Sequence, residues 1–184
     1  LLDEWDSEVQ TVKPSTVLTK AKEAHDTYPD KKLIVHFMQP HQPYLGDTGK
    51  KIELELSKHS KVSGWNNKLR KDGDDPTVSE GIKPLRAANH PEVDVEREDI
   101  IRAYEENIEI VLPHVEHLLE YIGGKSVISS DHGEMLGEKI RLFSEPTYGH
   151  HGRTWNRVLR EVPWLVQEGN ERRKTTSDPP DRYE

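Results

Sequence analysis

A short apolar run that ends in an acid, an imidazole and a glycine is the feature that most constrains this chain. The run spans residues 125–130 and is followed directly by Asp131, His132 and Gly133. It is β-branched in its middle, follows two glycines and is too short for a helix, so it predicts a buried strand. Asp131 and His132 then lie at the carboxyl end of this strand, where open α/β sheets bind ligands. Carboxylate and imidazole suit zinc, manganese or another divalent ion, and the glycine permits the sharp turn that aims both; a hydrogen-bonded loop is the alternative.

A helix and a second strand are predicted earlier in the chain. Residues 15–28 carry apolar side chains at helical spacing, with Ser15 as a candidate N-cap, and residues 32–38 have the composition of a buried strand. Two prolines then enclose His41 and hold its imidazole on a stiff loop at the strand's carboxyl end. His41 is therefore a candidate site residue, with an exposed loop histidine as the alternative. His36 lies within the strand, where it either faces a helix or reaches the same site.

The strongest helical pattern runs from residue 95 to residue 122 and stops at two glycines. Pro113 lies inside it and predicts a bend or a division of the helix, on whose surface His114 and His117 are expected. Residues 45–93 contain many glycines and prolines and predict an irregular excursion with one or two short helices, including Trp65–Lys71.

A glycine-rich loop near the carboxyl end carries the last candidates. Residues 134–139 are expected to form a helical turn, and residues 161–167 the next strand. Between them, glycines flank His150 and His151, so the loop can bring an imidazole close to a ligand without steric cost. His150 is the first choice and His151 the alternative, and Arg153 stands close enough to donate to an anionic ester.

Length, charge and the lack of cysteine limit the kind of protein. The 184 residues suffice for one domain, predicted over residues 1–168, followed by a polar, mobile tail at 169–184. With 34 acids against 26 bases and a net charge of -8, the composition argues against nucleic-acid binding. No apolar run reaches membrane-spanning length and no targeting segment is seen, which favours a soluble, cytoplasmic chain, while Leu1 hints at a longer product. The absence of cysteine leaves carboxylate, imidazole and hydroxyl groups as metal ligands.

Three blocks of sequence carry a resemblance to a known family. They are residues 36–44, residues 129–138, and residues 148–152 followed by 162–166. From about residue 30 to residue 168 the chain resembles the alkaline phosphatase superfamily, in particular its sulfatase-like branch and the related phosphoethanolamine transferases. The resemblance implies a layered α/β/α fold with a central, mostly parallel sheet, of which this chain is a carboxyl-terminal part. It also implies a metal-dependent hydrolase acting on a small sulfate or phosphate ester.

The same resemblance implies roles for individual residues. Asp131 and His132 would bind a divalent ion, such as zinc, manganese or calcium. His41 and His150 would bind the non-bridging oxygens, protonate a leaving group or hold a second ion; the further substrate-binding candidates are His36, His151 and Arg153.

One part of the family pattern is missing from this chain. No strand ending in an acid, and no Ser, Thr or Cys nucleophile at a helix start, precedes Asp131. The chain is therefore expected to work with a missing amino-terminal segment or as a homo-oligomer. The alternatives are a non-catalytic metal-binding remnant or interaction domain, and a structural α/β domain whose histidines are incidental.

Overall fold

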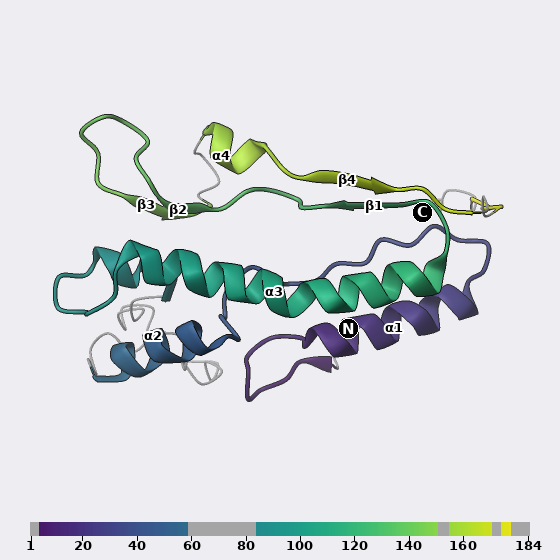
Figure 1. Ribbon diagram of the computed structural model, residues 1–184, viewed down its shortest axis with the longest axis horizontal. Helices are drawn as coiled ribbons and strands as arrows, with labels where there is room; N and C mark the ends of the chain where they lie inside the picture. Colours follow the sequence, from purple (N-terminus) through teal and green to yellow (C-terminus); the bar gives the residue numbers. More distant parts are fainter. Residues whose placement is uncertain (1–3, 59–83, 151–154, 171–173, 178–184) are drawn as a thin grey trace, which may run out of the picture.

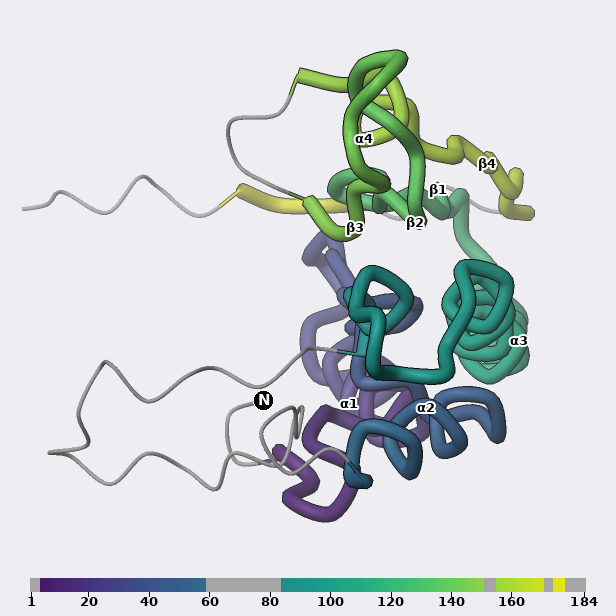
Figure 2. Tube along the Cα trace, turned by 90° about the vertical axis from the view of Figure 1, so that its left-hand side faces the viewer, coloured from purple at the N-terminus to yellow at the C-terminus, as the bar shows by residue number. Residues whose placement is uncertain are grey.

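The computed structural model describes residues 4–58, 84–150, 155–170 and 174–177. The long helix α3 lies between the helices α1 and α2 on one side and the short strands, with the small helix α4 beside them, on the other (Figure 1). Figure 2, turned by 90°, keeps the same order, with the strands above the helices. The prediction of a mixed α/β protein is confirmed.

Two of the helices agree closely with the sequence patterns. Helix α1 spans Pro14–Thr27, with Lys13 rather than Ser15 as its N-cap. The proline takes the first helical position, where its missing N–H costs nothing, so the helix begins earlier than predicted. Helix α3 spans Arg97–Ile122 and ends at Gly123, whose φ of 62° gives the left-handed cap that glycine favours. Pro113 lies inside α3 without dividing it.

The predicted central parallel sheet is wrong. The described residues form two separate two-stranded antiparallel sheets, one of β1 (Ser126–Ser129) with β4 (Trp164–Gln167) and one of β2 (Met135–Glu138) with β3 (Thr147–Gly149). Residues 33–38 are extended but pair with no strand in the described chain, and Ile34 is 99% exposed. The apolar run predicted a buried strand at residues 32–38, and this prediction is wrong, because apolar character alone cannot supply the pairing that makes a strand.

The turn expected at residues 134–139 is also wrong, because those residues form β2 instead. Its ladder with β3 is interrupted between Leu136 and Glu138, where Gly137 has a φ of 96°. A glycine in this conformation produces a bulge that bends the strand. The strand expected at residues 161–167 is confirmed, although it begins at Trp164.

The excursion at residues 45–93 is more ordered at its start than its composition suggests. It contains the helix α2 (Asp47–Lys58) and the short 3-10 helix η2 (Pro84–Asn89). One more helix, α4 (Arg157–Arg160), lies near the end of the chain. Gly49 lets α2 pack directly on Tyr44, since a Cβ there would lie 2.4 Å from the tyrosine's own Cβ. The helix predicted at Trp65–Lys71 lies outside the described residues.

The hydrophobic core lies between α2, η2, the first half of α3 and β3. Its buried members come from six separate segments: Tyr44, Ile52, Leu56, Leu85, Ala87, Val93, Val95, Ile100, Ala103 and Tyr148. The β1–β4 sheet lies outside this cluster, and all four residues of β4 are exposed. The largest buried cluster therefore lies at one end of the molecule, while α1 packs on α3 through further buried residues, including Val17 and Ala21. None of the helices in the described ranges has both the length and the apolar character needed to cross a membrane.

Candidate metal centre

The loop that carries His41 is fixed to the core. It follows the extended segment, and the His41 N–H donates to the Met38 carbonyl at 3.1 Å. Three residues later, Tyr44 is buried in the hydrophobic core. The imidazole Nδ1 lies 2.6 Å from the Gln42 carbonyl oxygen. Because a carbonyl can only accept, Nδ1 carries the proton, and Nε2 is left with the lone pair that a metal needs.

The segment after β1 turns sharply to present a second imidazole. His132 Nδ1 lies 2.9 Å from the Gly133 carbonyl oxygen, so its Nε2 is also available as an acceptor. Asp131 accepts the His132 N–H at 3.0 Å. Gly133 packs against α4 so closely that a Cβ there would lie 1.9 Å from the Val158 carbonyl oxygen. Only glycine fits this turn.

The register of β2 and β3 brings Glu134 and His150 together. Met135 pairs with Gly149, so the residues just beyond them, Glu134 and His150, face each other across the end of the ladder. His150 Nδ1 lies 3.0 Å and 3.2 Å from the two carboxylate oxygens of Glu134. The Glu134 side chain is only 5% exposed. A buried carboxylate beside an imidazole is the arrangement that orients metal-binding histidines in proteins.

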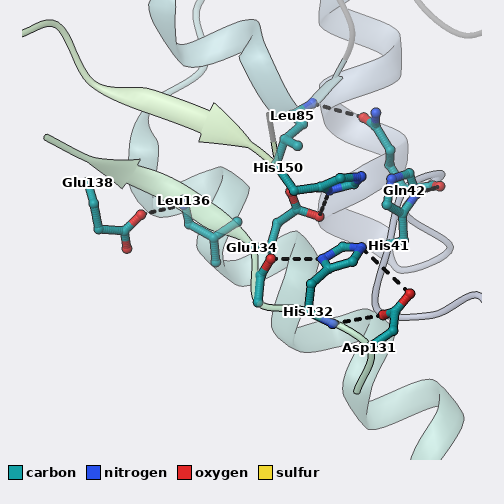
Figure 3. A network of polar contacts seen from close by, with 10 residues as sticks. His41, Gln42, Leu85, Asp131, His132, Glu134, Leu136, Glu138 and His150 are labelled. Carbon is teal, nitrogen blue, oxygen red and sulfur yellow. Dashed lines mark hydrogen bonds and ion pairs between the residues drawn. The ribbon is translucent and has the colours of Figure 1, made fainter. Parts of the chain in front are cut away.

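The three loops meet at one place, although no single sheet joins them (Figure 3). The His150 ring lies 4.1 Å from that of His132 and 5.5 Å from that of His41, centroid to centroid. One potential ligand atom from each of His41, Glu134 and His150 lies within 4.8 Å of the others, close enough to share one metal ion. The group contains two imidazoles and one carboxylate, a donor set that suits zinc and other transition metals.

Asp131 lies at the edge of this group. Its side chain is 66% exposed, and its Oδ2 lies 3.7 Å from His132 Nε2. It is not among the three residues whose ligand atoms converge.

Of the remaining sequence candidates, those in the described residues lie away from the group. His36 is exposed on the extended segment and lines a separate groove against α1, together with Val17 and Ala21. His151 and Arg153 lie outside the described residues. His114 and His117, expected on the surface of α3, are half-buried and exposed respectively.

The carboxylate of Glu134 contributes to the pKa of two tyrosines, Tyr44 and Tyr104. Burial, with a smaller contribution from the Glu134 carboxylate, raises the pKa of Tyr104 to about 12. Burial also raises the pKa of Tyr44 above its usual range, again with a smaller contribution from Glu134. Both phenols therefore stay protonated at neutral pH and add no negative charge to the carboxylates of Glu134 and Asp131 beside the histidines.

Comparison with known proteins does not place the chain in a family. Family models, curated proteins and solved structures all give no match to it. The resemblance to the sulfatase-like branch of the alkaline phosphatase superfamily thus stays a prediction. The geometry of the described residues has to carry the functional argument.

Sequence reasoning missed Glu134 as a site residue. It was assigned to a helical turn, whereas its position depends on the pairing of β2 with β3. The only signal in the sequence was its place three residues after Asp131, which does not reveal a partner 16 residues later.

Proposed function

We propose that this chain carries the divalent-metal site of a hydrolase acting on sulfate or phosphate esters. The observation that supports this most is the convergence of His41, Glu134 and His150 from three separate segments, with ligand atoms within 4.8 Å of one another. A catalytic zinc site normally has three protein ligands and an open fourth position, which this group matches in number and in chemistry. Two nitrogen donors favour zinc or manganese over calcium, which prefers oxygen ligands.

The ion and the surrounding residues would have separate roles toward the ester. A divalent ion would polarise the phosphoryl or sulfuryl oxygen and lower the pKa of a bound nucleophile. His132 stacks on His150 with its Nε2 available, so it is suited to bind a non-bridging oxygen or to move a proton. Glu134, held against His150, fixes that imidazole and offsets the positive charge of the ion.

Asp131 and His132 remain candidates for the metal ligands themselves, as the sequence resemblance implies. Both border the three-residue group, and no hydrogen bond from the described residues occupies His132 Nε2, which lies 3.7 Å from Asp131 Oδ2. The ion would then lie toward the exposed side of the site. The effect of Asp131→Asn on metal affinity distinguishes an ion bound at Asp131 and His132 from one bound among the three-residue group.

A non-catalytic metal-binding domain is the second candidate. One observation favours it: the hydroxyls near Glu134 are the phenols of Tyr44 and Tyr104, and their raised pKa makes both poor nucleophiles at neutral pH. Such a domain would bind the same ion without turnover. A nucleophile supplied by another part of the protein would make hydrolysis possible at the same site.

One experiment separates these possibilities. The chain is stripped with a chelator, supplied with zinc or manganese, and assayed for hydrolysis of p-nitrophenyl phosphate and p-nitrophenyl sulfate, with His150→Ala as the matched inactive variant. Metal-dependent hydrolysis that His150→Ala abolishes supports the hydrolase. Tight metal binding without hydrolysis supports the binding domain and counts against the hydrolase. Absence of metal binding contradicts both.

A further inference from the structure

Asn107 is a polar residue on the face of α3 that otherwise buries apolar side chains. It is fully buried, and the buried positions around it on the helix are Ile100, Ala103 and Val111. Asparagine is a poor helix former, and a buried amide is costly unless it is hydrogen-bonded. An apolar residue would serve the helix better, so the amide must act outside α3.

All four hydrogen bonds of the Asn107 amide go to the loop that carries His41. Its Nδ2 donates to the carbonyls of Pro40 at 3.3 Å, His41 at 3.2 Å and Pro43 at 3.0 Å. Its Oδ1 accepts the Leu45 N–H at 2.7 Å. One side chain thus binds the backbone on both sides of His41.

This loop needs such a clamp because its own backbone has few donors. Its two prolines have no N–H, and the Asn107 amide supplies a donor to each of their half-buried carbonyls. Gln42 adds a second anchor, since its Oε1 accepts the Leu85 N–H at 3.2 Å. The backbone from which the His41 side chain extends is therefore fixed from α3 and from η2.

We infer that Asn107 is a positioning residue for the metal centre, which holds the His41 imidazole at the distance where it can share an ion with Glu134 and His150. The inference rests on the metal site of the proposed function. Ligand geometry is sensitive to such support: loss of an outer hydrogen-bonding partner typically lowers metal affinity about 10- to 100-fold. The hydrogen bonds of Asn107 within the described residues go to the His41 loop and not to Glu134 or His150, so its effect on the ion passes through His41.

The test compares Asn107→Ala with Val111→Ala. Val111 is buried on the same face of α3, one turn further along, and its truncation removes buried apolar packing while leaving the hydrogen bonds of Asn107 to the loop in place. Zinc affinity is measured by competition with a chromophoric chelator, and Co²⁺ is bound in parallel so that its visible spectrum reports the ligand geometry. Circular dichroism and urea unfolding show how far each variant is folded.

We expect Asn107→Ala to lower zinc affinity about 10- to 100-fold and to change the Co²⁺ spectrum, while Val111→Ala changes both much less at similar stability. Should Asn107→Ala not fold, Asn107→Gln replaces it, because it keeps a buried amide but shifts it by one methylene. Equal zinc affinities in the Asn107 and Val111 variants would overturn the inference. A failure of the unaltered chain to bind zinc would contradict the metal centre itself, and the role of Asn107 with it.

Discussion

The two loops that bring histidines to the candidate site are held in different ways. The His41 loop, residues 39–45, is anchored by Tyr44 in the core and by the Asn107 amide. The Asp131 loop, residues 130–134, is held mainly by its own backbone and by the Gly133 N–H, which donates to the Leu159 carbonyl at 3.0 Å. Only Glu134, at its end, is deeply buried.

This difference indicates which part of the site exists before a ligand arrives. The His41 loop is part of the well-packed end of the molecule, so His41 is positioned by the fold. The Asp131 loop leads from the exposed β1–β4 sheet, so the imidazole of His132 depends on local contacts. We therefore expect His41, Glu134 and His150 to determine metal affinity, and His132 with Asp131 to adjust to what binds.

Loss of a buried side chain should lower the free energy of unfolding more in the core next to the His41 loop than in the β1–β4 sheet. Ile100→Ala removes a fully buried side chain from the cluster that contains Tyr44, and we expect it to lower the free energy of unfolding by about 2–5 kcal/mol. Val127→Ala in β1, where the side chain is 45% exposed, should cost about 0.5 kcal/mol or less. Urea unfolding measures both. Similar losses in the two variants would remove the contrast between the two ends.

Removing a ligand from the converging group should have the largest effect on metal binding. His150→Ala deletes the imidazole that contacts Glu134, and we expect zinc affinity to fall by more than about 100-fold, since loss of a supporting residue alone can cost that much. His117→Ala on the exposed side of α3 is the control. Calorimetric titration compares them. An unchanged affinity in His150→Ala would place the ion elsewhere.

A substitution in the Asp131 loop should disturb that loop alone. Gly133→Ala forces a Cβ to within 1.9 Å of the Val158 carbonyl oxygen, and such overpacking should cost about 1–3 kcal/mol of stability. Gly124→Ala is the matched control, because the nearest atom to its new Cβ would be 3.8 Å away. Thermal unfolding reports the cost. A neutral Gly133→Ala would mean that the loop and α4 separate freely.

The smallest effect is expected at Asp131. If the ion lies among His41, Glu134 and His150, Asp131→Asn should reduce zinc affinity by less than about 5-fold, because exposed ion pairs contribute only ~0–1 kcal/mol. The same chelator competition applies. A loss above about 100-fold would move the ion to Asp131 and His132, where the sequence resemblance puts it.

The sequence predicted the features that depend on local patterns. Helices α1 and α3 follow from apolar spacing over many residues, and Gly123 follows from the need for a left-handed cap. The meeting of the His41, Asp131 and His150 loops was also expected, although that expectation drew on resemblance to a family. The helix α2 was not predicted in detail, because Gly49 and a high charge content resemble a loop until the close contact with Tyr44 is known.

What could not be predicted depends on pairing between distant segments. The central parallel sheet failed because residues 33–38 find no partner strand in the described chain, whatever their apolar character. Glu134 was missed for the same reason, since only the Met135–Gly149 register places it opposite His150. The sequence pattern did not single out Asn107, and its role appears only when the carbonyls of the His41 loop surround it.

Zinc titration of the chelator-treated chain by isothermal calorimetry tests the central claim most directly. The account predicts saturable binding of zinc by the unaltered chain, lost when His41 and His150 are both replaced by alanine while circular dichroism shows the fold intact. No binding by the unaltered chain, or equal binding by the folded double variant, would contradict it.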